Sequence, residues 1–182
     1  MKINVGNAIL EIVVGNIVTE DTEAIVNPAQ KSLHPGCGVD GQIHLWGGTQ
    51  IQRECGELNG CETGDAKITT GGELQAKFVI HTVGPIWSGG NAGEPGLLAS
   101  CYRRCLEVAS ENGIDSIAFP AVSTGDYSYP LEQAAPIALQ TVVQYLTEQG
   151  SPHLVRFVLK GRKSFEVHCS ALTALMPTGE QD

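Results

Sequence analysis

Positively charged residues are scarce in this sequence. The 182 residues include 11 lysines and arginines against 20 aspartates and glutamates, which gives a formal net charge of −9 and a pI near 4.9. Such a surface repels polyanions, so the charge balance argues against broad electrostatic binding to nucleic acid or to an anionic membrane. A small anionic ligand would have to be held by local backbone N–H groups, because the overall field is unfavourable to it.

Long apolar runs are also missing. No stretch approaches the roughly 18 apolar residues of a membrane span, and residues 1–15 lack the apolar core of a signal peptide. We therefore expect a cytoplasmic protein without membrane contact. No Cys-x-x-Cys pair occurs among the six cysteines, which are Cys37, Cys55, Cys61, Cys101, Cys105 and Cys169. This spacing argues against a zinc finger, and we expect reduced thiols, no metal and no cofactor.

No internal repeat, linker or low-complexity segment interrupts the chain. We therefore expect one domain over residues 1–177, followed by a frayed tail at 178–182. Apolar, β-branched runs predict strands at 2–5, 10–14, 24–27, 66–70, 78–83, 116–122 and 154–159. Helical spacing predicts helices at 41–55, 96–112, 131–149 and 164–175. Their alternation predicts the α/β class, as a three-layer α/β/α sandwich with a mixed, largely parallel central sheet.

Glycines are concentrated in one loop that leads into a predicted helix. Gly36, Gly38 and Gly41 fall within six positions, after the strand that ends at Asn27. Glycine allows the backbone N–H groups of such a loop to turn toward one point, which favours an anion. A second loop, 123–129, follows another predicted strand. Because ligands bind outside the carboxyl ends of parallel strands, we expect the two loops to converge.

A carboxylate, Asp40, stands inside the first loop, where it would repel an anion. General-base chemistry would explain its presence, and a helix N-cap is the alternative. The pattern Gly36-x-Gly38-x-x-Gly41 also fits the dinucleotide fingerprint, with Glu62 near the place of a ribose-binding acid. That fingerprint follows a strand directly, whereas residues 28–35 intervene here, so the context argues against a dehydrogenase.

Asn27 and the segment from Gly36 to His44 resemble the signature of macro domains, a family that binds ADP-ribose. The resemblance recurs at residues 14–17, 81–87 and 119–130, and it extends over roughly residues 10–160 in the family's order. The sequence is most similar to the MacroD type. Members of that branch remove mono-ADP-ribose from acidic side chains and deacetylate O-acetyl-ADP-ribose.

The resemblance implies roles for individual residues. Asp40 would position or deprotonate the water that attacks the anomeric carbon, and Asn27 would help to orient the distal ribose or its loop. Tyr127 would cover that ribose, while His44, one helical turn after Asp40, could share its face. Backbone N–H groups would clamp the diphosphate from two sides; they belong to Gly36, Cys37, Gly38 and Val39 and to Ser123, Thr124, Gly125, Asp126 and Tyr127.

The sequence departs from the family pattern at both ends of the implied ligand. Gln30 stands where the family has a second asparagine at the reacting centre, and a shift near 1 Å there can cost about 10²-fold in rate. Asn16, followed by Ile17 in the first ligand loop, replaces the aspartate that grips adenine. Lys160 replaces the aromatic residue that stacks on adenine. Cys37 replaces a glycine and could narrow its loop.

Three hypotheses follow. The first is a hydrolase of ADP-ribosyl esters, acting on mono-ADP-ribosylated aspartate or glutamate and on O-acetyl-ADP-ribose, with Asp40, Asn27 and Gln30 at the reacting centre. The second, supported by Gln30, is a module that binds ADP-ribose or ADP-ribosylated protein with little turnover. The third, supported by Asn16 and Lys160, is the same fold with another nucleotide diphosphate.

Three further side chains receive structural interpretations. His81, inside an apolar strand, is expected to be a hydrogen-bonded core histidine. Trp46 and Trp87 are expected in the core or in a pocket wall.

Overall fold

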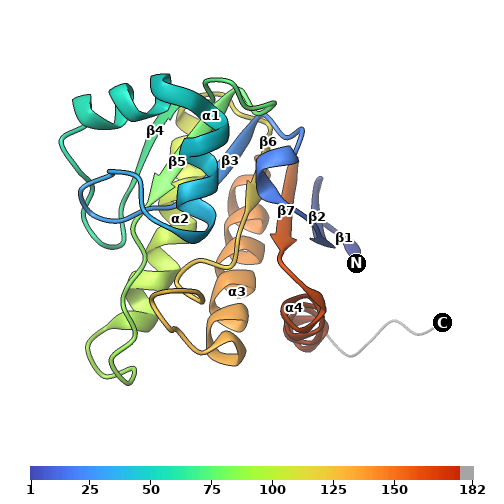
Figure 1. Cartoon of the computed structure of the whole chain (residues 1–182). Helices are drawn as coiled ribbons and strands as arrows, with labels where there is room; N and C mark the ends of the chain where they lie inside the picture. The colour runs from blue at the N-terminus through green and yellow to red at the C-terminus, as the bar shows by residue number, and fades with distance from the viewer. Residues whose placement is uncertain (177–182) are drawn as a thin grey trace.

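A mixed seven-stranded sheet forms the middle layer of the fold (Figure 1). The structure is a computed structural model that describes residues 1–176; the predicted tail at 178–182 lies outside the described residues. The strands are β1 (Lys2–Val5), β2 (Ala8–Val14), β3 (Ala24–Pro28), β4 (Ala66–Thr70), β5 (Phe78–Thr82), β6 (Ser116–Phe119) and β7 (Leu154–Leu159). Their order is β1-β2-β7-β6-β3-β5-β4. The five inner strands run parallel, and the edge strands β1 and β4 are antiparallel to their neighbours.

Helices cover both faces of this sheet (Figure 1). They are α1 (Gly38–Glu57), α2 (Glu94–Glu111), α3 (Leu131–Gln149) and α4 (Arg162–Leu175), with a short 3₁₀ turn, η1 (Ile17–Thr19). One hydrophobic cluster joins α2, α3 and α4 to the sheet, and a second joins α1 and η1 to the opposite face. The predicted three-layer α/β/α sandwich is therefore confirmed. Within residues 1–176, none of the helices has the length and apolar character needed to cross a membrane.

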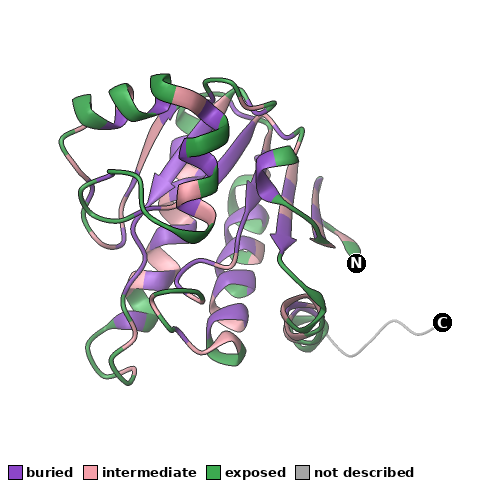
Figure 2. Cartoon of the chain, in the orientation of Figure 1, coloured by how far each residue is buried: buried purple, intermediate pink, exposed green. Residues whose placement is uncertain are grey.

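The inner strands are mostly apolar because helices cover both faces of the sheet. Figure 2 shows these strands as buried, while the outer face of α1 is exposed. At the centre, the rings of Tyr102, Phe119 and Phe157 lie 5.2 to 5.9 Å apart between centroids. Burial of one such ring contributes about 1.5–3 kcal/mol to stability.

Most predicted element bounds are confirmed within a few residues, and the differences have local causes. α3 and β7 have the predicted limits. β6 ends at Phe119 and not at residue 122, because Pro120 has no N–H to continue the ladder. α1 begins three residues earlier than predicted and is divided at Gly48, where φ is 76°. The prediction for Trp46 is wrong: its side chain lies on the outer face of α1 and is 58% exposed.

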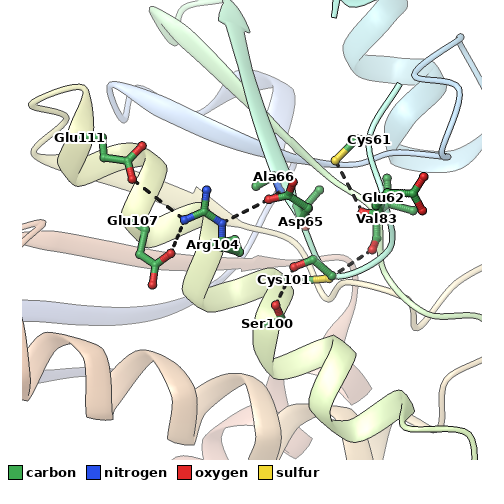
Figure 3. A network of polar contacts seen from close by, with 12 residues as sticks. Cys61, Glu62, Asp65, Ala66, Val83, Ser100, Cys101, Arg104, Glu107 and Glu111 are labelled. Atoms are coloured by element: carbon green, nitrogen blue, oxygen red, sulfur yellow. Dashed lines mark hydrogen bonds and ion pairs between the residues drawn. The ribbon is translucent and has the colours of Figure 1, made fainter. Parts of the chain in front are cut away.

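Polar contacts fix α2 to the segment that precedes β4 (Figure 3). The guanidinium of Arg104 donates to Asp65 at 3.2 Å and also contacts Glu107. One turn earlier, the hydroxyl of Ser100 donates to the carbonyl of Gly64 at 2.7 Å, and the thiol of Cys101 lies 3.3 Å from the carbonyl of Val83. These contacts hold the end of β5 against α2, and so fix the start of the loop at 84–93.

Candidate functional site

The carboxyl ends of four neighbouring parallel strands lie along one edge of the sheet. Val14 of β2 pairs with Leu159 of β7, and β6 and β3 continue the same parallel order. A predicted ligand segment follows each end: Asn16 follows β2, Lys160 follows β7, residues 36–39 follow β3, and residues 123–127 follow β6. In open α/β sheets this edge is where ligands bind.

The two glycine-containing loops at this edge touch each other, as the strand pattern predicted. The thiol of Cys37 donates to Oδ2 of Asp126 at 2.9 Å. A Cβ placed on Gly38 would lie 3.8 Å from the same oxygen. Gly38 and Ser123 both have left-handed backbone angles, with φ of 60° and 66°. Such residues turn consecutive N–H groups toward one side of the chain.

Several N–H groups in these loops make no hydrogen bond with any part of residues 1–176. They belong to Cys37, Gly38 and Val39 at the start of α1 and to Ser123, Gly125, Asp126 and Tyr127 after β6. The N–H of Thr124 makes only a 3.4 Å turn contact with Ala121. Gly36 differs from the prediction, because its N–H already donates to Asp40.

Both loops also lie in stretches without cations. The sequence has no lysine or arginine between residues 32 and 52, nor between residues 105 and 155. The hydroxyl of Ser123 is buried and, among the described residues, has no hydrogen-bond partner. The donors that these two loops themselves offer to an anion are therefore backbone amides and hydroxyls.

Asp40, the third residue of α1, joins the first loop to the sheet. Its Oδ2 accepts the N–H of Gly36 at 2.5 Å, and its Oδ1 accepts Nδ2 of Asn27 at 2.6 Å. Burial by itself would raise the pKa of this carboxyl, but contacts with His44, Asn27 and Gly36 outweigh burial and lower the pKa below its usual value. Asp40 is therefore ionised at neutral pH. The alternative, that Asp40 is the N-cap of the helix, is wrong: the N-cap residue is Cys37, and Asp40 accepts instead from the N–H of Gly36, which precedes the N-cap.

His44 lies on the same face of α1 as Asp40, as its spacing predicted. Its Nε2 is 3.5 Å from Oδ1 of Asp40, and the side chain is 2% exposed. Neither ring nitrogen makes a hydrogen bond within the described part of the chain. His44 and Asp40 thus form a buried acid–imidazole contact at the start of α1.

His81 of β5 is a hydrogen-bonded core histidine, as predicted. Its Nδ1 is 3.0 Å from Nδ2 of Asn27, and its Nε2 is 2.9 Å from the hydroxyl of Thr69. Burial lowers the pKa of His81 to about 4, so the ring is neutral at pH 7. Sequence reasoning missed the connection from His81 through Asn27 to Asp40, because the two strand residues are 54 positions apart and nothing in the sequence reveals their pairing.

His44, Cys55 and His81 form a buried trio whose possible ligand atoms lie within 4.8 Å of one another. Ligands of a tetrahedral zinc are about 3.5 Å apart, given metal–ligand bonds of roughly 2.0–2.3 Å. Both nitrogens of His81 already make hydrogen bonds. Burial raises the pKa of the Cys55 thiol to about 12, which disfavours the thiolate that a metal needs. We therefore assign no metal to this trio.

The remaining predicted residues, Gln30, Asn16 and Lys160, lie in the segments that follow β3, β2 and β7. Gln30 is exposed, and its Nε2 donates to the carbonyl of His34 at 2.9 Å. Asn16 uses its side-chain oxygen to cap η1, at 3.4 Å from the N–H of Val18. Lys160 is exposed beyond β7. Trp87 supports the second loop, because its backbone N–H donates to the backbone carbonyl of Tyr127 at 2.9 Å.

Comparison with known proteins decides the family. The Macro domain family model matches residues 26–138, a span that includes both loops. The chain belongs to the macro domain family. A macro domain-containing protein of Mesorhizobium japonicum is 47% identical over 91% of this chain and 94% of its own length. An O-acetyl-ADP-ribose deacetylase of Cronobacter turicensis is 48% identical over 86% of this chain and 91% of its own length.

Solved macrodomains have the same structure. A macrodomain of Oceanobacillus iheyensis with ADP superposes with a TM-score of 0.93 at 42% identity, covering 96% of this chain and 95% of that one. A Trypanosoma brucei macrodomain in complex with ADP-ribose gives 0.85 at 36% identity, covering 90% and 68%. The macro domain described here thus shares its fold with proteins that hold these nucleotides.

Proposed function

We propose that this macro domain binds ADP-ribose between its two loops and hydrolyses ADP-ribosyl esters. One observation carries the proposal: two loops that touch at this edge of the sheet contain backbone N–H groups without a hydrogen-bond partner in residues 1–176, next to the ionised carboxylate of Asp40. Amides that are already fixed need little reorganisation to hold a diphosphate, and they require no cation. The relatives named for ADP-ribose or its acetyl ester give the proposal independent support.

The proposed chemistry on an aspartyl or glutamyl ester needs only one carboxylate of the enzyme. Water attacks the anomeric carbon of the distal ribose, and the bond from that carbon to the ester oxygen breaks. The electron pair leaves with the substrate's carboxylate, whose pKa of about 4 makes protonation of the leaving group unnecessary. Asp40 orients the water and takes its proton as the new bond forms. Its negative charge also stabilises the positive charge that develops on the sugar.

An ADP-ribose titration and a hydrolysis assay on the same sample test the proposal. We expect calorimetric binding together with release of ADP-ribose from a mono-ADP-ribosylated acidic protein. The variant Asp40→Ala should lower the rate by about 10²–10⁴-fold, the usual contribution of a positioned base. Wild-type turnover in this variant would reject the role of Asp40.

A binding module with little turnover is a second candidate, favoured by the position of Gln30. Its amide is one methylene longer than asparagine and is bound to the carbonyl of His34. Tight ADP-ribose binding beside negligible hydrolysis in the same sample would favour this candidate.

A different nucleotide diphosphate is a third candidate, favoured by Asn16. Its side-chain oxygen is occupied in capping η1. A thermal-shift panel of nucleotide diphosphates tests this candidate. If ADP-ribose gives the largest stabilisation, the third candidate is rejected.

A further inference from the structure

We propose that His81 is a positioning residue that, acting through the amide of Asn27, holds the carboxylate of Asp40 in its working orientation. This inference rests on the proposed function, in which Asp40 acts at the distal ribose. It extends the site into the sheet, to a side chain that does not face the loops.

The strand register brings the three partners together. Asn27 of β3 pairs directly with His81 of β5, so both side chains project from the same face of the sheet. Thr69 of β4 lies diagonally across from His81 on the neighbouring strand. The face in question is the one that α1 covers, where Asp40 lies in the first turn. A continuous row of polar side chains therefore crosses three strands and ends at α1.

The hydrogen bonds in this row have one consistent direction. Asp40 is ionised and can only accept, so the group 2.6 Å from its Oδ1 is the NH₂ of Asn27 and not the amide oxygen. The same nitrogen lies 3.0 Å from Nδ1 of His81, which must therefore be the unprotonated, accepting nitrogen. The proton of the ring is then on Nε2, which donates to the hydroxyl of Thr69 at 2.9 Å. That hydroxyl donates in turn to the carbonyl of Thr70 at 3.0 Å.

This arrangement gives His81 a specific task. The two hydrogens of the Asn27 amide have two acceptors, Asp40 and His81, and together they determine the rotation of the amide. Without an acceptor at the place of Nδ1, one buried N–H of Asn27 loses its partner and the amide is free to turn. Oδ1 of Asp40 would then lose its fixed donor, while Oδ2 would keep only the N–H of Gly36. Small errors of this kind at a reacting centre are costly in rate.

Two isosteric variants separate positioning from packing. In His81→Asn, the amide oxygen can occupy the place of Nδ1 and accept from Asn27. In His81→Gln, the amide reaches the place of Nε2 and contacts Thr69, but no group remains at the place of Nδ1. We expect His81→Gln to lower kcat by about 10–10²-fold with a smaller change in KM, while His81→Asn retains most of kcat. Wild-type kcat in His81→Gln, or equal losses in both variants, would overturn the proposal.

A matched control is available in His168 of α4. It is buried to a similar degree, with 1% exposure, and its Nδ1 lies 2.9 Å from the carbonyl of Ser164, on the opposite side of the sheet. His168→Gln should lower the melting temperature without lowering kcat. A loss of kcat in this variant would mean that the effect at His81 comes from general destabilisation, and would also overturn the proposal.

Two further readouts do not depend on turnover. Nitrogen NMR of the wild-type protein should show a proton on Nε2 of His81 and none on Nδ1; the opposite tautomer would contradict the proposal. Hydrogen exchange of the Gly36 amide should be faster in His81→Gln than in His81→Asn, because Asp40 is then less firmly held. Unchanged exchange in His81→Gln would count against positioning. If the wild-type protein binds ADP-ribose but does not turn over the ester, hydrolysis fails, and these two readouts still decide the role of His81.

Discussion

Cys37 and Asp126 join the two loops of the site, through a thiol that donates to the carboxylate at 2.9 Å. The hydrogen bond to Asp126 and its negative charge raise the pKa of the Cys37 thiol above its ordinary value. Because the thiolate is the nucleophile, an exposed cysteine at this position should react slowly.

Replacing Asp126 should therefore make Cys37 more reactive. In Asp126→Asn the pKa of the thiol falls toward its ordinary value, and alkylation by iodoacetamide at pH 8 should be faster than in the wild-type protein. Peptide mapping by mass spectrometry gives the rate at Cys37 alone, and Asp115→Asn, remote from the loops, is the matched control. Equal rates in the wild-type protein and Asp126→Asn would contradict the role of this contact.

Shortening Gln30 should raise turnover under the proposed function. Gln30→Asn removes one methylene and brings the amide back by about 1 Å, a distance that can change a rate by up to about 10²-fold. The measurement is kcat on a mono-ADP-ribosylated acidic protein, and Gln144→Asn on the exposed face of α3 is the control. No gain in Gln30→Asn would show that the position of this amide does not limit the rate.

Asp40 should make stability depend on pH in the acid range. Its pKa is lowered in the folded state, so it contributes stability above its unfolded pKa of about 3.9, and this contribution is lost as pH falls through the folded value. At pH 7, Asp40→Asn should lose about 1–3 kcal/mol, because charge-assisted hydrogen bonds are removed. The difference from the wild-type protein should shrink below pH 4. Urea unfolding at pH 7 and at pH 3 measures it, and a constant difference would argue against an ionised Asp40.

Glu94 should hold the loop that supports Trp87. Its carboxylate accepts from the hydroxyl and N–H of Ser88 and from the N–H groups of Gly90 and Ala92. These bonds, the Ser88 hydroxyl first, lower the pKa of Glu94 to about 2. The loop is then stabilised above about pH 4.5 and loosens as pH falls toward 2. Hydrogen exchange at residues 88–92 should be faster in Glu94→Gln and unchanged in Glu111→Gln.

Two glycines of α1 should respond to alanine with opposite signs. Gly48 has a φ of 76°, and a Cβ there would lie 2.8 Å from Oε1 of Glu73, so Gly48→Ala should cost about 1–2 kcal/mol. Gly56 is helical with open space around its Cβ position, so Gly56→Ala should stabilise by about 0.4–1 kcal/mol. Thermal unfolding of both variants checks the pair, and the same sign in both would contradict a break at Gly48.

The sequence predicts the layers and the two ligand loops better than it predicts contacts within the site. The spacing of apolar residues and the local composition are properties of short segments, and they predict the first and last residues of α3 and β7 correctly. The family resemblance gives the loops for the same reason, because their glycine spacing is local. The prediction for Trp46 fails because this side chain lies on the exposed face of α1. A helix with glycines in its middle has no clear apolar stripe that would show which face is buried.

The polar row from Thr69 to Asp40 could not be predicted, because it depends on strand order. β3 lies between β6 and β5, and only this order places Asn27 beside His81. In the sequence His81 is one polar residue inside an apolar strand, and such a residue is usually explained by the core alone. The direction of its hydrogen bonds becomes visible when all four side chains have positions.

Main-chain donors have a consequence for how this site could be lost or redesigned. An arginine that binds phosphate disappears with a single substitution, whereas an amide hydrogen is present in every residue except proline. The left-handed turns at Gly38 and Ser123 determine the direction of those hydrogens, so other side chains in the loops can vary while the donors remain. Alanine scanning would therefore underestimate the importance of these loops. A β-branched residue at position 38 would alter the path of the backbone itself, and so remove several donors with one change.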